Sequence, residues 1–173
     1  GTALISGSSA EGNYVNIDTG AAVTVTGTGS SLSTMETRTS GGTLNINGGA
    51  VVTNGSGVVG GTVLVSGKDA GGSSSTWTNT DYFVIGDGAA GGLEVRAGGK
   101  VNVTADASLG GTYFGTALVS GAGSMWETTG RLSIDNGSLR IEDGGSVSNG
   151  LGIIGDTFSA GSVIVTGQGS RWI

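Results

Sequence analysis

The amino-acid sequence predicts an all-β protein: a right-handed, three-faced parallel β-helix, or solenoid, of about seven to eight coils. Three observations predict this fold. The chain of 173 residues repeats itself at a regular interval, short apolar-x-apolar segments recur within each repeat, and 38 glycines occur without a single proline.

The repeat is clearest in three stretches of ten residues. They read VTVTGTGSSL at 23–32, ALVSGAGSMW at 117–126 and VIVTGQGSRW at 163–172, and a longer copy, TVLVSGKDAGGSSSTW, spans 62–77. The residues that close the four copies lie 45, 49 and 46 positions apart and are Leu32, Trp77, Trp126 and Trp172. A second block alternates with the first and reads LNINGGAVV at 44–52, LEVRAGGKV at 93–101 and LRIEDGGSV at 139–147. Two kinds of coil, each of about 23 residues, therefore alternate along the chain.

Each coil is expected to contain three short strands, because three columns of apolar residues recur at the coil spacing. The first column is Val25, Ile46, Val65, Val95, Val119, Ile141 and Val165. The second is Leu32, Val52, Trp77, Val101, Trp126, Val147 and Trp172. The third is Val59, Ile85, Leu109, Ile134 and Ile154, with Met35 as the candidate for its first member. The regular spacing of the tryptophans favours a place in the core over an exposed platform for sugars.

The glycine and proline content suits stacked parallel strands. Each strand pairs with its equivalent one coil further on, about 4.8 Å away. One coil cannot bury its apolar face alone, whereas stacked coils form a continuous core. Glycine permits the positive φ angles of tight corners, and proline would remove hydrogen bonds from the ladder. The right-handed form is predicted because crossovers between parallel strands take that hand.

Charge and composition exclude several classes of function. A formal net charge of −6 with 7 lysines and arginines leaves no basic face for nucleic acid. The chain has no histidine and no cysteine, which excludes Ser-His-Asp and Cys-His catalysis and zinc sites built from those ligands. We expect no cofactor and no enzyme activity.

Carboxylates are the remaining candidates for chemistry. Asp69, Asp81 and Asp87 form the best acidic group, around the insertion in the 62–77 copy. Asp87 and Asp156 both stand in an IGD sequence, which favours a role in repeated turns, where aspartate bonds to nearby backbone. A cation site and a catalytic carboxylate pair are the alternatives.

The alternation of VxVxGxGSxW with LxVxxGGxV and IGD resembles the repeats in passenger domains of bacterial type V autotransporters. The resemblance is greatest to the adhesins of diffuse adherence and to the self-associating autotransporters. It covers residues 23–172 and is most specific at 121–126 and 167–172, whereas Leu32 and the insertion KDAGGSSST depart from the pattern. It implies a chain exported through its own outer-membrane translocator barrel and displayed as a rigid stalk, either anchored at the bacterial cell surface or secreted.

Residues 1–173 are expected to be a single β-helix segment of a longer passenger domain. GTALISG at 1–7 matches GTALVSG at 115–121, so the sequence begins inside a repeat, and it stops inside another after Trp172.

The residues that flank the first column are expected to point outward and to form one side of the rod. The candidate contact residues on this side are Leu64, Leu118, Ile164, Glu94, Arg96, Arg140 and Glu142. The three aliphatic residues occur in alternate coils and are the candidate apolar anchors, with the charged residues in the coils between them. The alternatives are a solvated face and a flat contact surface for a host-cell or surface receptor or for another copy of the chain.

The predicted function is that of a surface adhesin stalk for cell adhesion or self-association. A polysaccharide-active β-helix enzyme is the main alternative, because carboxylate pairs on such a fold cleave polysaccharides. Ice binding would need Thr-x-Thr on successive coils, and Thr24 and Thr26 are followed instead by Asn45 and Asn47.

Overall fold

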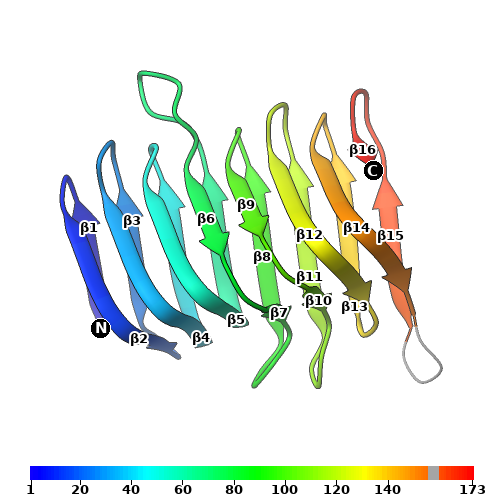
Figure 1. The fold of residues 1–173 in the computed structure, drawn as a ribbon, viewed down its shortest axis with the longest axis horizontal. Coiled ribbons are helices and arrows are strands. Elements are labelled where there is room, and N and C mark those ends of the chain that lie inside the picture. Colours follow the sequence, from blue (N-terminus) through cyan, green and yellow to red (C-terminus); the bar gives the residue numbers. More distant parts are fainter. Residues whose placement is uncertain (156–159) are drawn as a thin grey trace.

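The computed structural model describes residues 1–155 and 160–173, which form sixteen β-strands joined in one continuous sheet. The sheet is wound into a rod of stacked coils, with the two termini at opposite ends (Figure 1). Every pairing between strands is parallel, and no helix occurs among the described residues. Accordingly, no helix in this part of the chain could cross a membrane. The predicted all-β solenoid is confirmed.

Each coil presents three faces, and the chain visits them in the same order every time. The first face consists of β1 (Thr2–Ser6), β3 (Ala22–Thr26), the ends of β4 (Ser31–Asn47) and β5 (Val51–Ser66), β8 (Gly91–Arg96), β11 (Gly115–Ser120), β13 (Gly137–Glu142) and β15 (Gly161–Val165). The second consists of the starts of β2 (Ser9–Asp18), β4 and β5, β6 (Thr76–Asn79), β9 (Lys100–Val103), the starts of β12 (Met125–Ile134) and β14 (Ser146–Ile154), and β16 (Arg171–Trp172). The third consists of the end of β2, the middle parts of β4 and β5, β7 (Phe83–Ile85), β10 (Ala107–Leu109), and the ends of β12 and β14.

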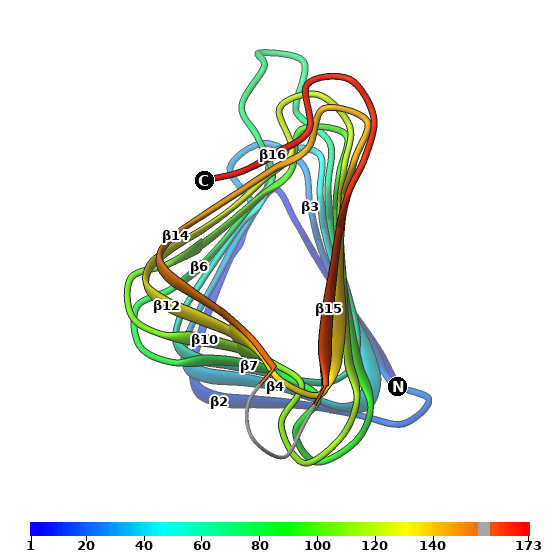
Figure 2. The same ribbon diagram turned by 90° about the vertical axis from the view of Figure 1, so that its right-hand side faces the viewer.

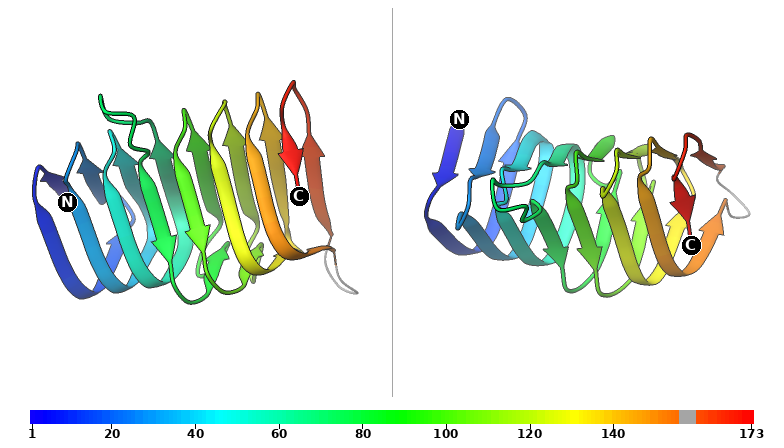
Figure 3. Two further views of the ribbon diagram at one scale, coloured as in Figure 1. Left: turned by 45° about the horizontal axis from the view of Figure 1, so that its top comes forward. Right: turned by 90° about the horizontal axis from the view of Figure 1, so that it is seen from above.

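The rod is right-handed and triangular in section. In Figure 2, seen from the C-terminal end, the chain ascends along β15, turns at the upper corner and continues into β16 while approaching the viewer. About eight coils stack in this way, in agreement with the prediction. We call the corner between the first and second faces the first corner, that between the second and third faces the second corner, and that between the third and first faces the third corner. Figure 3 shows the coils following one another in an even stack, with one hairpin projecting at the first corner between β5 and β6.

Strand register confirms the first two predicted columns. Consecutive pairings run through the first column in the order Val25, Ile46, Val65, Val95, Val119, Ile141 and Val165. Consecutive pairings run through the second in the order Leu32, Val52, Trp77, Val101, Trp126, Val147 and Trp172. Trp77 and Trp126 are fully buried, and the ring of Phe83 lies edge-on to both, 5.1 Å from the first ring centre and 5.9 Å from the second. The core role predicted for these two tryptophans is confirmed.

The third column is confirmed from Val59 onward, but its predicted start is wrong. Pairings connect Val59, Ile85, Leu109, Ile134 and Ile154. Met35 lies at the second corner with 70% of its surface exposed, and Thr39 pairs with Val59 and is buried instead. Threonine has the branched shape of valine, so it fills the same space, and an argument based on apolarity alone overlooks it.

The alternation of two coil types has a physical cause at the first corner. The serine of each GxGS or GSSS corner accepts a hydrogen bond from a glycine N–H one coil before it, and the pairs are Gly7 with Ser30, Gly49 with Ser75, Gly98 with Ser124, and Gly144 with Ser170. The N–H to hydroxyl distances are 2.7 to 3.0 Å. Three of these glycines, Gly49, Gly98 and Gly144, stand in the GG sequences of the second block, and because an unpaired N–H in such a setting is costly, each of those corners needs a serine-type corner beside it.

A polar column runs inside the second face next to the tryptophans. The indole N–H of Trp77 donates to Oδ1 of Asn54 at 2.5 Å, and Nδ2 of Asn54 donates to Oδ1 of Asn79 at 2.6 Å. Trp172 donates to Asn149 in the same manner. Val103 occupies the equivalent place beside Trp126, and within the described part of the chain the indole N–H of Trp126 has no partner.

Candidate contact surface

The first face is the one that the sequence predicts as a contact surface. Its outward side chains form a column whose order, given by the strand register, is Leu4, Thr24, Asn45, Leu64, Glu94, Leu118, Arg140 and Ile164. A second outward column, two residues further along each strand, is Ser6, Thr26, Asn47, Ser66, Arg96, Ser120 and Glu142. The structure therefore places all seven candidate residues on one face, in two adjacent columns.

The aliphatic candidates differ in exposure. Leu64 and Leu118 are half-buried, because longer polar side chains flank them in the neighbouring coils, whereas 49% of Ile164 is exposed. Glu94 separates Leu64 from Leu118, and Arg140 separates Leu118 from Ile164. Isolated aliphatic groups alternate with charges along this column.

The four charged candidates form ion pairs within their own strands. Glu94 contacts Arg96 on β8, and Arg140 contacts Glu142 on β13, so each strand carries both signs and no net charge. The order of signs is reversed between the two strands. β11 lies between them, which puts them about 9.6 Å apart at the usual strand spacing, too far for direct ion pairs.

Two open hollows meet on this face. One has a volume of about 390 Å³ and extends past Glu94 and Leu118 to Arg140, and the other, of about 570 Å³, extends to the third corner. Thr62, Gly92 and Thr116 line both hollows, which makes them one bent groove. Phe114, in the loop between β10 and β11, lines its end at the third corner.

The hairpin at the first corner contains the predicted insertion. Lys68 and Ser74 form an antiparallel bridge, and the carboxylate of Asp69 accepts hydrogen bonds from the Ser73 N–H at 2.8 Å and the Thr28 hydroxyl at 3.1 Å. The bond from the Ser73 backbone, helped by that from Thr28, lowers the pKa of Asp69. Asp69 therefore orders its own turn, as the sequence predicts for aspartate in this chain.

The third face carries a polar cluster that sequence reasoning missed. Arg38 lies 3.2 Å from Glu36 and 3.5 Å from Asp87, and the hydroxyl of Tyr82 donates to Glu36 at 3.5 Å. The contacts of Arg38 with Asp87 and of Tyr82 with Glu36 pass over an intervening coil. In that coil Val58 is 1% exposed, although it lies outside the interior core. Burial lowers the pKa of Arg38, but the hydrogen bond and charge of Glu36 outweigh that effect and raise it. The partners lie 46 and 49 positions apart, and although Asp87 stands in a repeated IGD sequence, Arg38 belongs to no repeated motif.

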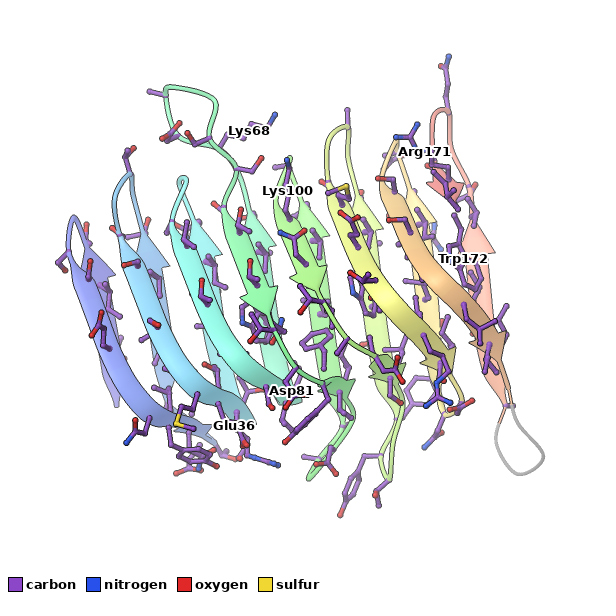
Figure 4. All side chains as sticks on the ribbon, viewed as in Figure 1. Glu36, Lys68, Asp81, Lys100, Arg171 and Trp172 are labelled. Atoms are coloured by element: carbon purple, nitrogen blue, oxygen red, sulfur yellow. The ribbon has the colours of Figure 1, made fainter. Side chains whose placement is uncertain are left out.

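The predicted acidic group does not form. Asp69 lies in the hairpin at the first corner, Asp81 at the second corner between β6 and β7, and Asp87 at the third corner between β7 and β8. Figure 4 shows Asp81 well away from the hairpin that holds Lys68. The interpretation as one group is wrong because neighbours in sequence are carried to different corners of the coil. No three acidic side chains among residues 1–155 and 160–173 gather to hold a metal ion. Asp156 lies outside the described residues.

The fold and this surface define a class of protein: a repetitive β-solenoid rod whose broad lateral faces are available for contact. The chain is 33% identical over 121 residues to the adhesin BmaC autotransporter of Brucella suis biovar 1 (strain 1330), a match that covers 64% of this chain and 3% of that relative. No protein-family model matches the sequence, and no solved structure matches it. The similarity and the solenoid together confirm the predicted resemblance to autotransporter passenger repeats, and they support an adhesin-type passenger segment.

Proposed function

We propose that this segment is a non-catalytic contact module of a surface-displayed adhesin, and that two copies associate through their first faces. The observation that carries this proposal is the order of residues in the outward column: aliphatic, acidic, aliphatic, basic, aliphatic, from Leu64 to Ile164. A host-cell or other surface receptor is the alternative occupant of the same face.

The face is complementary to itself about a two-fold axis that lies in the interface along β11. Such an axis makes the two rods antiparallel and places each strand opposite the strand equally far on the other side of β11. Glu94 then faces Arg140 of the second copy, Arg96 faces Glu142, and Leu118 faces Leu118. All opposed charges differ in sign, and aliphatic groups meet aliphatic groups.

A parallel arrangement of the two rods fits less well. A two-fold axis along the rod also brings Glu94 opposite Arg96 and Arg140 opposite Glu142. It opposes Leu118 to Ser120, however, and so loses the apolar contacts at the centre of the face. The antiparallel pair is therefore favoured.

The expected association is weak. With the axis on β11, only the five coils from β5 to β15 overlap, and their five-residue strands give a shared face of about 24 Å by about 17 Å, or roughly 400 Å², against the ~800 Å² per partner of a standard specific interface. Contacts must be summed over many coils, as a longer stalk would allow.

Charge reversal on one strand tests the arrangement. In the half-swap Glu94→Arg with Arg96→Glu, the ion pair on β8 is kept, but all four opposed pairs of the antiparallel dimer become like-charged. We expect self-association, measured by analytical ultracentrifugation, to weaken by at least about tenfold, since each exposed pair contributes ~0.2–1 kcal/mol. Adding Arg140→Glu and Glu142→Arg should restore it.

The control outcomes are distinct. A half-swap that associates as well as the wild type points to the parallel arrangement, which this exchange leaves complementary. The triple change Leu64→Lys, Leu118→Lys and Ile164→Lys should abolish association in either arrangement. A wild-type chain that stays monomeric at every concentration would refute self-association and leave the receptor as the partner.

A further inference from the structure

Neither the backbone conformation nor close packing requires glycine at position 92. It lies inside strand β8, its φ is not positive, and a Cβ added to it would touch nothing but the hydroxyl of Thr116, at 3.3 Å. The glycine that precedes it is different, because a Cβ on Gly91 would collide with the backbone of Val59. Glycine within a strand weakens it and often marks a place that a ligand approaches closely.

The absence of a side chain at Gly92 creates the groove. The outward neighbours of Gly92 in adjacent coils are Thr62 and Thr116, so one gap interrupts a row of hydroxyl side chains. The two hollows, of about 390 and 570 Å³, join at this gap. Each volume is within the usual range for ligand sites, and the joined shape suits a chain lying across several coils.

The residues that line the groove indicate what kind of ligand it would bind. Phe114 is 49% exposed at one end and offers an apolar ring face. The hydroxyl of Thr116 donates to the Gly91 carbonyl at 3.3 Å, which leaves its lone pairs free to accept from a ligand. Glu94 and Arg140 are each neutralised by an ion pair on their own strand, so the lining has no net charge and favours neither cations nor anions.

We propose that this groove binds an uncharged oligosaccharide chain, with one sugar ring against Phe114 and the next over Gly92. A pyranose ring has an apolar C–H face that stacks on an aromatic ring and a rim of hydroxyls that matches Thr62 and Thr116. The groove shares Glu94, Leu118 and Arg140 with the face proposed for self-association, so a sugar chain and a second copy would compete, whereas Gly92 and Phe114 lie outside the charged pairs that match two copies.

The proposal is tested by titrating maltohexaose, cellohexaose and chitohexaose into the labelled chain, at a protein concentration where ultracentrifugation gives a monomer. Amide chemical shifts in NMR spectra are the readout. At least one probe should give saturable shifts, at millimolar concentration or below, centred on the amides of Gly92, Phe114 and Thr116. Hexagalacturonate, which has carboxylates on every ring, should bind less well.

Three variants locate the site. Phe114→Ala should weaken binding by about tenfold, through loss of the stacked ring. Gly92→Gln should abolish it by filling the gap, and the melting temperature should change little, because a Cβ there meets only the Thr116 hydroxyl, at 3.3 Å, which can rotate away. Tyr113→Ala is the matched control, because Tyr113 is 47% exposed in the same loop but does not line the groove, and its effect should stay within about twofold. The proposal is overturned if none of the neutral probes shifts these amides, or if Gly92→Gln binds as the wild type does.

Discussion

The asparagine column beside the tryptophans yields a prediction about stability, and a second coil of the same chain provides the comparison. At the Trp77 level, Asn54 accepts from the indole and donates to Asn79. At the Trp126 level, Val103 stands in the corresponding place. Around it, and within the described residues, Nδ2 of Asn79, the Trp126 indole N–H and the Thr128 hydroxyl are buried without partners.

Val103→Asn should stabilise the rod. Oδ1 of the new side chain can accept from both Asn79 and Trp126, as that of Asn54 accepts from Trp77, and its Nδ2 can donate to Thr128. Relief of three unpaired groups at about 1 kcal/mol each, less about 2 kcal/mol for dehydrating one carboxamide, leaves a net gain of about 1 kcal/mol. For a chain of this size, the melting temperature should rise by about 2–4 °C.

The reverse change, Asn54→Val, imposes the Val103 arrangement on the other coil. It leaves the Trp77 indole and Oδ1 of Asn79 without their partners in a fully buried setting. Two unsatisfied groups at ~1–3 kcal/mol each predict a loss of roughly 2–6 kcal/mol.

Both variants are measured by thermal and urea denaturation followed by circular dichroism. A Val103→Asn protein that is less stable than the wild type, or an Asn54→Val protein of unchanged stability, would show that hydrogen bonding in this column does not govern the packing of the second face.

Further predictions concern the core, the corners and the charge. Val119→Asp should unfold the rod or strongly destabilise it by burying an unpaired carboxylate, and an unchanged melting temperature would contradict its inward position. Ala97→Gly should stabilise by about 1 kcal/mol, since Ala97 has a φ of 52° where the equivalent Gly48 has 63°; denaturation midpoints check this. Deletion of residues 68–73 should leave a folded rod, because other coils close the first corner with shorter loops; loss of the circular dichroism signal would instead give the hairpin a supporting role. Self-association in sedimentation runs should strengthen from low to physiological salt as the repulsion between two chains of charge −6 is screened, and the opposite trend would reveal dominant contact ion pairs.

Repetition explains which features were predictable. Trp77, Trp126 and Trp172 recur at similar spacings of 49 and 46 positions, so their shared column could be inferred without coordinates. Thr39 could not be placed in the third column, because its polarity conceals that its shape fits the core. The ion pair between Arg38 and Asp87 also escaped prediction, since it joins different parts of two coils that are separated by a third, and Arg38 has no equivalent in another copy of the repeat.

The candidate contact surface was also predictable only in part. The outward column was predicted from the strand period, and the structure places it as expected. The groove was not, because Gly92 looks in sequence like any of the other glycines. Its position between the outward hydroxyls of Thr62 and Thr116, with an ordinary φ and only the Thr116 hydroxyl near a Cβ, exists only in three dimensions.

The surface alternation has a consequence for how two copies would align. The aliphatic groups alone repeat every two coils, so they would also meet one another if one rod slid by two coils, which moves the antiparallel axis from β11 to β8 or β13. The charged residues on β8 and β13 exclude these shifted arrangements. With the axis on β8, Glu94 would face Glu94 of the second copy, and Arg96 would face Arg96. With the axis on β13, Arg140 would face Arg140. An axis midway between β11 and either neighbouring strand is also unfavourable, because it sets Glu94 or Arg140 against Leu118. The inverted order of signs on β8 and β13 therefore selects β11 as the centre, and the half-swap acts on the feature that fixes this register.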